Sequence, residues 1–258
     1  MINFFRKIRQ QMLNQNKTSR YFKYALGEII LVVFGILIAL QINNWNENRK
    51  AANEETKILK ALQVDFKDSK NRIEETMSSQ QKVLDHSSIL INIHERADEK
   101  EFEYFDTHLD SLKKLIDYGT TWYRTEPVTG AYNALISAGK VDLIKNEKLR
   151  HELAQFSADL ESGFEDQQPA IDLLTILQTD VSPFILEIAG NTYRKRFNIS
   201  PRKHDTIVVS KQYFSNKSYF GNLLSKHQLE FNRINRQKSL LNQTYSILKI
   251  IEQELLQD

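Results

Sequence analysis

The longest apolar stretch of the chain lies near its N-terminus. Residues 24–42 comprise fifteen apolar or aromatic residues, two glycines and two polar residues, Glu28 and Gln41. A helix of this length spans about 28 Å, close to the ~30 Å hydrocarbon core of a bilayer. Trp45 follows the stretch and basic residues precede it, as at the two interfaces of a membrane. We therefore expect a transmembrane helix over residues 24–44.

Two alternatives fit this stretch less well. Its uninterrupted apolar run, residues 29–40, is short enough for a buried core helix. The run also fits the apolar region of a cleaved signal peptide, but the preceding basic segment is long and no A-x-A site follows Leu40.

The apolar positions after Trp45 recur with the spacing of helices that pack along one another. No Gly or Pro occurs between Trp45 and Gly119, so one helix can continue from the span as a stalk. Its expected core positions are Leu59, Leu62, Phe66, Ile73, Met77, Leu84 and Ile91.

Four shorter helices and a final long one are expected to follow. Asp98 with Glu101 is a capping pair for the first, and Pro127 suits the first turn of the second. Asn146 can cap the third, and Pro183 predicts a kink or a restart in the fourth. The four cover residues 98–119, 127–139, 146–160 and 170–189, and residues 190–217 are expected as mixed loop with a short strand over 206–210.

The final helix, residues 218–256, should pack antiparallel to the stalk. Its expected seam is Leu224, Phe231, Ile234, Leu241, Tyr245, Leu248 and Leu255, interrupted by Lys238 and Glu252. We therefore predict an all-α fold in which an N-terminal transmembrane helix continues into an extracytoplasmic antiparallel helical bundle.

Composition supports this fold class. Gly and Pro total only 12 residues, too few for the many tight turns of a β-sandwich or barrel. The absence of Cys excludes disulfide frameworks, thiolate zinc sites and thiol nucleophiles.

The distribution of charge predicts the orientation. Residues 1–25 contain six Lys or Arg and no acid, which places the N-terminus in the cytoplasm. We expect a cytoplasmic basic amphipathic segment over residues 1–23, the span over 24–44, and a periplasmic domain over 45–258. The N-terminal phenylalanines and the adjacent span favour lipid over nucleic acid as the partner of the basic segment.

Two features inside the span suggest more than anchoring. Gly27, Gly35 and Ala39 share one helix face, a spacing that lets two backbones approach and predicts a homo-oligomer. A lipid-facing role for these small residues is the alternative. Glu28 is an intramembrane polar residue, placed where it can reach the headgroups or pair with Lys23 or Arg20.

The residues of the N-terminal part resemble a known family. MINFFRKIRQ and then YALGEIILVVFGILIALQINNWNENRK are similar to the N-terminal signature of an uncharacterised family of single-pass membrane proteins of Bacteroidota. Residues 131–153, AYNALISAGKVDLIKNEKLRHEL, resemble a second segment of that family. The resemblance implies an inner-membrane protein with an extracytoplasmic helical domain, and it implies no catalytic residue, substrate or cofactor.

The sequence contains no recognisable catalytic or metal-binding motif. The six histidines form neither H-x-x-x-H nor H-E-x-x-H, and phosphate-binding glycine loops and G-x-S-x-G are absent. We therefore expect no catalytic residue, no metal and no cofactor.

The strongest candidate for recognition is a basic segment, Arg194, Lys195, Arg196, Arg202 and Lys203, with no acid between Gly190 and Asp205. Guanidinium groups there suit an anion or an acidic partner, although a solvated basic loop is the alternative. A second cluster, Trp122 to Arg124, fits either a plug between helices or a lid over a ligand.

These features predict a non-enzymatic interaction protein, a scaffold or accessory subunit held in the inner membrane with an envelope protein as its partner. A sensor of a ligand or of the envelope state, signalling through a second membrane protein, is the alternative. An envelope hydrolase is a weaker third hypothesis.

Overall fold

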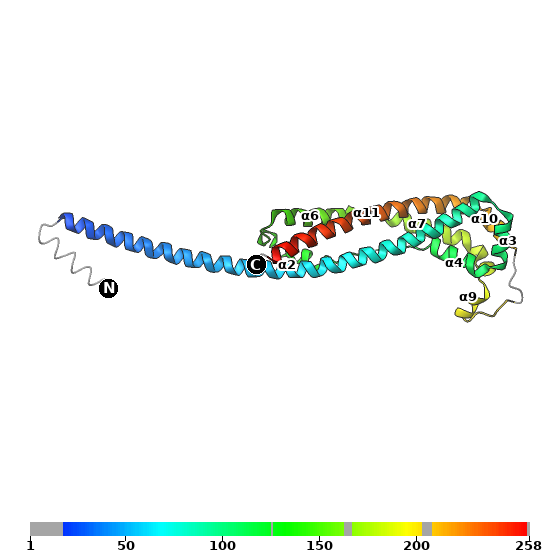
Figure 1. Ribbon diagram of the computed structural model, residues 1–258, viewed down its shortest axis with the longest axis horizontal. Coiled ribbons are helices and arrows are strands. Elements are labelled where there is room, and N and C mark those ends of the chain that lie inside the picture. Colours follow the sequence, from blue (N-terminus) through cyan, green and yellow to red (C-terminus); the bar gives the residue numbers. More distant parts are fainter. Residues whose placement is uncertain (1–17, 125, 163–166, 203–207, 257–258) are drawn as a thin grey trace. The chain divides into compact units, whose positions relative to one another are not determined.

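The computed structural model describes residues 18–124, 126–162, 167–202 and 208–256, and no strand is present in those ranges (Figure 1). The all-helical prediction therefore agrees with the structure of the described residues. The chain divides into two compact units, Met1–Lys57 and Ile58–Asp258, here called unit 1 and unit 2. Helix α2 (Thr18–Arg96) contributes to both. Most of the predicted N-terminal amphipathic segment, residues 1–17, lies outside the described residues.

In unit 1, α2 exposes nearly all of its apolar side chains. Leu31 is 74% exposed and Phe34 is 61% exposed, and the other large apolar residues from Leu26 to Ile42 are similarly uncovered. One helix among the described residues has a stretch long and apolar enough to cross a membrane, and it is this one.

Unit 2 is built around the remainder of α2 and the long helix α11. The two run in opposite directions, because His227 Nδ1 lies 2.8 Å from Ser87 Oγ while Tyr245 Oη donates to Glu74 Oε1 at 2.5 Å (Figure 1). Helices α6 and α7 pack along α11. The helices after α2 are α3 (Glu99–Thr107), α4 (Leu109–Gly119), α5 (Gly130–Ser137), η1 (Val141–Leu143), α6 (Glu147–Ser162), α7 (Gln167–Val181), η2 (Ser182–Phe184), α8 (Ile185–Ile188), α9 (Asn191–Arg196), α10 (Ser210–Phe214) and α11 (Lys217–Leu255).

The core of unit 2 consists of two apolar clusters. The first, here the α6 cluster, joins α2 residues such as Leu62 and Phe66 to Phe156 of α6 and Ile247 of α11. The second, the α3 cluster, joins the end of α2 to α3, α4, α7, α8, α10 and the start of α11, and it is rich in aromatic rings. The expected stalk positions Leu59, Leu62, Phe66, Ile73 and Leu84 are buried, and Met77 and Ile91 are half-buried.

Two helix boundaries differ from the prediction for reasons the structure makes clear. The expected helix 98–119 is divided at His108, whose ring Nδ1 lies 2.9 Å from Tyr104 O. The side chain thereby takes the carbonyl that would otherwise accept the next helical hydrogen bond. The expected helix 127–139 begins only at Gly130, because Asp65 of α2 accepts a hydrogen bond from Ala131 N (2.6 Å) and so caps α5 from outside.

The segment 190–217 contains two short helices where mixed loop was expected. Asp106 of α3 accepts hydrogen bonds from Val209 N (3.0 Å) and Ser210 N (2.9 Å), which starts α10. The short strand predicted over 206–210 is therefore wrong at Ser210, and its first two residues lie outside the described part. The restart predicted at Pro183 is confirmed, since η2 separates α7 from α8 there.

The predicted seam of α11 is wrong in phase at several positions, although Leu248 is buried and Ile234, Leu241 and Leu255 are half-buried. Leu224 and Phe231 are 55% and 54% exposed, and Tyr245 is exposed as well. The buried face is shifted by one residue and keeps alternating steps of three and four. It comprises Tyr219, Leu223, Lys226, Glu230, Arg233, Gln237, Leu240, Thr244, Ile247 and Ile251.

Candidate functional site

The small residues of the predicted span lie on an uncovered face of α2. Gly27, Gly35 and Ala39 are exposed in unit 1, and a Cβ added at either glycine would meet no atom within 4 Å. Glu28 lies beside them, is half-buried and takes part in an interaction within the chain. This face can therefore accept a closely packed helix or lipid without rearrangement inside one copy.

The five predicted basic residues do not form one cluster of free cations. Arg194 turns back onto the main chain, where its guanidinium donates to Ala189 O (3.1 Å), Leu186 O (3.3 Å) and Ser200 O (3.1 Å). Lys195 and Arg196 are exposed, whereas Arg202 is half-buried. Lys203 lies outside the described residues. Arg194 thus stabilises the segment, and the exposed positive charge comes from its neighbours.

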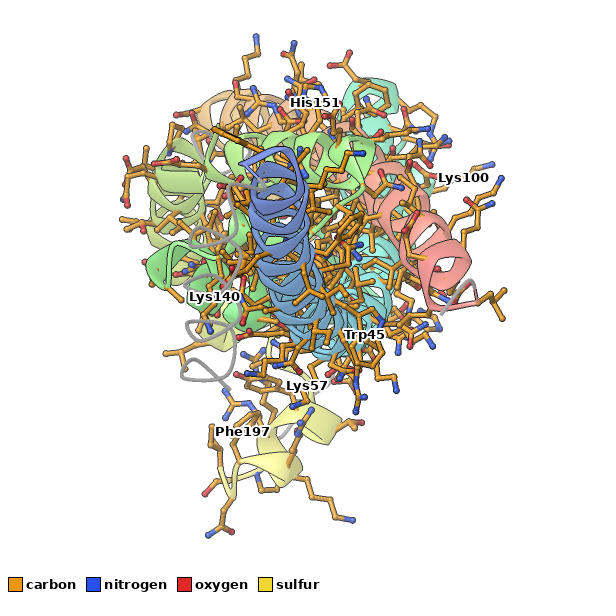
Figure 2. The ribbon with its side chains drawn as sticks, turned by 90° about the vertical axis from the view of Figure 1, so that its left-hand side faces the viewer. Trp45, Lys57, Lys100, Lys140, His151 and Phe197 are labelled. Atoms are coloured by element: carbon orange, nitrogen blue, oxygen red, sulfur yellow. The ribbon has the colours of Figure 1, made fainter. Side chains whose placement is uncertain are left out.

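The basic segment is part of a projecting surface, here called the knob and defined as residues 185–202. Figure 2 shows α9 standing away from the other helices of unit 2, with Phe197 directly after its last residue. The knob is held by Asn191, whose Oδ1 accepts from Arg202 N (2.8 Å), and by Tyr193, whose ring lies 4.4 Å from Lys113 Nζ. At its base Gly190 packs so closely on Asp110 that a Cβ would lie 2.4 Å from the carboxylate. The knob is therefore tied to α4.

The Trp122 to Arg124 cluster is part of a strap, residues 120–129 except 125, that crosses unit 2. Tyr123 O accepts from Arg233 Nη2 (2.7 Å) and from Gln80 Nε2 (3.4 Å), while the ring of Trp122 lies 4.8 Å from the Arg233 guanidinium. Ser69 Oγ exchanges hydrogen bonds with Val128 in both directions. This packing matches a plug between helices, not a lid.

Beneath the strap lies a buried polar layer formed by Gln80, Lys226, Glu230 and Arg233. It separates the α3 cluster from the α6 cluster. Lys226 is 1% exposed and Glu230 0%. Glu230 accepts from Arg233 Nη1 at 3.0 and 2.9 Å and from Lys226 Nζ at 3.4 Å. Burial lowers the pKa of Lys226, and the adjacent Glu230 opposes that shift.

The sequence interpretation missed this layer. Its signal is nevertheless present, because Lys226, Glu230 and Arg233 continue the three-four spacing of Leu223 and Leu240. Two layer-side acceptors, Gln80 Oε1 and Gln237 Oε1, are buried without a hydrogen-bond partner, as is Trp122 Nε1. Each of these groups is an unsatisfied polar atom in the core and costs free energy. A small displacement of the helices that lets one of them gain a hydrogen bond would therefore change the free energy of their packing.

The described histidines do not converge on a metal site. No group of three or more His, Asp or Glu side chains able to hold an ion is present among the described residues. His94 instead lines a cavity of about 390 Å³ at the α3 end of unit 2. Its ring stacks on Phe220 at 4.2 Å, and its Nδ1 donates to Phe214 O at 2.6 Å. Glu99 and Lys211 form an ion pair at the rim of this cavity.

Comparison with known proteins gives one match. The model of a family of unknown function, DUF6090, matches residues 28–158, slightly more than half of the chain. The matched part runs from within the apolar stretch into α6 and leaves the knob and α11 outside. No curated protein and no solved structure matches the chain.

Proposed function

The chain belongs to the family of unknown function DUF6090, and from that premise we propose that it is a single-span membrane protein whose extracytoplasmic helical bundle binds other proteins of the cell envelope. Its N-terminus lies in the cytoplasm and its bundle in the periplasm. The similarity of its first 50 residues to proteins of Bacteroidota supports an inner-membrane location.

The proposed membrane anchoring rests on one observation. The large apolar side chains of α2 are exposed throughout the segment between Leu26 and Ile42. Soluble proteins rarely expose contiguous apolar surface beyond a few hundred Å². A lipid bilayer removes the free-energy cost of exposing this apolar surface to water. The six basic residues before the apolar segment, with Trp45 after it, support the proposed orientation.

The interaction role is supported by the knob. It projects from unit 2 while exposing Leu186 and Phe197 beside Lys195 and Arg196. Aromatic residues and arginine are enriched at the centres of protein interfaces. The exposed apolar and basic side chains of the knob therefore support a binding role.

The anchoring is tested by extraction and by topology. We expect the full chain to stay in the membrane pellet after alkaline carbonate treatment, and phosphatase fused after Asp258 to be active. Replacing Phe34 and Leu37 by Arg should release the chain, because each arginine at the centre of a span costs about 3 kcal/mol. Val64→Arg, on an exposed position of the same helix in unit 2, is the matched control. Release of the unaltered chain, or fluorescence of a C-terminal reporter that matures only in the cytosol, would contradict the proposal.

The sensor remains the second candidate because α2 is continuous from the apolar stretch to Arg96 and borders the buried polar layer. A change of packing at that layer would act on a helix that also forms the span. In this candidate function a second membrane protein would carry the signal. Crosslinking in native membranes tests this candidate. A partner whose crosslinks change when Arg233 is replaced by Ala would favour the sensor, and an unchanged pattern would count against it.

A further inference from the structure

The knob carries most of the unbalanced positive charge of unit 2. Unit 2 contains 26 Lys or Arg and 29 Asp or Glu, and the knob holds four of these bases with one acid, Glu187. The remainder of unit 2 is therefore strongly acidic. This separation of charge gives two copies of the chain an attraction that a uniform distribution would not.

The most acidic element near the knob is α3 with the residues that flank it. Residues 98–110 contain six acidic residues and one lysine. Glu99 and Glu101 are engaged with Lys211 and Arg96, but Glu103 is exposed. Tyr104 is also exposed, and its ring stacks on His108 at 4.0 Å. This face therefore offers an aromatic ring and an exposed carboxylate on an acidic element.

We propose that the knob of one copy docks on the α3 face of a second copy. The inference deepens the proposed function, on which it rests, by naming a partner of the interaction surface. Phe197 and Ile199 supply apolar area, with Lys195 and Arg196 opposite Glu103. Arg194 keeps the knob in shape through its three carbonyl contacts. A preformed surface loses little entropy on binding.

The placement of the two surfaces suits a two-fold pair. Both α3 and α9 contact α4, so the knob and the α3 face adjoin the same helix. A two-fold axis near α4 would bring the knob of each copy to the α3 face of the other, and the contact would occur twice. The doubled contact strengthens an association that exposed charge pairs alone would leave weak.

The absence of cysteine allows a direct test in the full chain in its membrane. Two differently tagged copies are co-expressed, one with Ile199→Cys and the other with Tyr104→Cys, and treated with a short bis-maleimide. We expect a crosslinked species that carries both tags. The control pair is Ile199→Cys with Ile136→Cys, since Ile136 is exposed on α5 beside the α6 cluster. That pair should give no product.

Charge exchange separates recognition from simple proximity. Reversing Lys195 and Arg196 to Glu in both copies should reduce the mixed product by about tenfold or more, because like charges then face each other. Adding Glu103→Lys should restore part of it. Reversal of Lys140 and Lys148, which are exposed on the other part of unit 2, changes net charge equally and should leave the yield unchanged. Unchanged helical content by circular dichroism shows that the reversals leave the fold intact.

Three results would overturn the inference: no mixed product, a product of Ile199→Cys with itself only, or a knob that crosslinks to another protein while the chain stays monomeric. None of them bears on anchoring, which carbonate extraction measures independently. Conversely, a chain released by carbonate that still gives the mixed product would refute the anchor and keep the contact.

Discussion

At the scale of single residues, Arg233 connects α11, the strap and the buried polar layer. Its guanidinium pairs with buried Glu230, donates to Tyr123 O of the strap and lies against the ring of Trp122. Two cations and one carboxylate are thereby buried together, an arrangement that stabilises less than apolar packing would but leaves large penalties when one member is removed. Its main effect is to fix which residues of α11 face α2.

Arg233→Ala should therefore destabilise the protein by about 3–5 kcal/mol, because Glu230 is left buried with only a long contact to Lys226. Urea unfolding of the detergent-solubilised chain, followed by circular dichroism, measures the change. Lys238→Ala on the exposed side of the same helix is the control and should stay within about 0.5 kcal/mol. A loss equal to that of the control would show that the ion pair is not buried in solution.

His227 predicts a dependence of stability on pH. Burial, and then the charge of Lys226, lower its pKa below the ordinary value of 6.5. The unfolded chain then binds the proton more readily than the folded one. Its contribution to the free energy of unfolding is therefore complete above the ordinary pKa and lost as the pH falls through it.

The melting temperature should therefore fall between pH of about 7.5 and about 5.5, and His227→Gln should reduce that fall. The amide can still bond to Ser87, so the contact itself is preserved. His151→Gln, at an exposed position of α6, serves as the control. An identical decline in all three proteins would assign the pH dependence to other groups.

At the scale of helices, patterns of apolar residues predicted most elements but not every face or end. The spacing of Leu59 to Leu84 predicted the buried face of α2 because that face is largely apolar. On α11 the central part of the buried face is formed by Lys226, Glu230 and Arg233. The pattern of apolar residues therefore predicts the neighbouring apolar stripe as the buried face instead. When the central core positions of a helix are charged, its buried face can be recognised only from the apolar residues that continue the same spacing on both sides of them.

Local sequence patterns also could not predict helix ends that are set by residues far away in the sequence. Asp65 starts α5 and Asp106 starts α10, and in each case the cap and the helix are far apart in sequence. Local caps behaved differently: the N-caps predicted at Asp98 and Asn146 are confirmed, since Asp98 accepts from Lys100 N and Asn146 from Leu149 N. Glu101, predicted to pair with Asp98, binds Arg96 instead. For the candidate site, the basic composition of residues 194–203 indicated the surface, but only the fold shows that Arg194 supports it while Lys195 and Arg196 are exposed.

The turn between α2 and α3 gives a prediction about an element boundary. Ala97 has a φ of +49°, a left-handed conformation that costs a residue with a Cβ about 1–2 kcal/mol. Ala97→Gly removes this strain and should raise the free energy of unfolding by about 1 kcal/mol. The greater conformational freedom of glycine in the unfolded chain reduces that gain.

The reverse change provides its control. Gly139 has a φ of +63°, and a Cβ there would meet nothing within 4 Å, so Gly139→Ala isolates the backbone term. It should destabilise by about 1 kcal/mol. Chemical unfolding of both variants measures the two effects, and equal signs would rule out strain at these helix ends.

At the scale of the whole molecule, the association that we propose between copies involves two separate surfaces. One is the knob with its acidic complement in unit 2, and the other is the small-residue face of α2 in unit 1. They make different demands on the environment: charge pairs in water weaken with salt, whereas close backbone packing needs lipid around it. The two contributions can therefore be separated in one chain.

Gly35→Leu should weaken association through unit 1. Within one copy the larger side chain meets nothing, because a Cβ at Gly35 has open space around it, so the fold of a single chain is unaffected. Between copies it would push apart backbones that Gly35 and Ala39 allow to approach. Val33→Leu, on the opposite side of the helix, is the matched control. The measurement is a membrane two-hybrid assay of the full chain in which Lys195 and Arg196 are reversed to remove the knob contact. In that background Gly35→Leu should lower the signal, and Val33→Leu should not. Equal signals from both variants would mean that this face meets lipid.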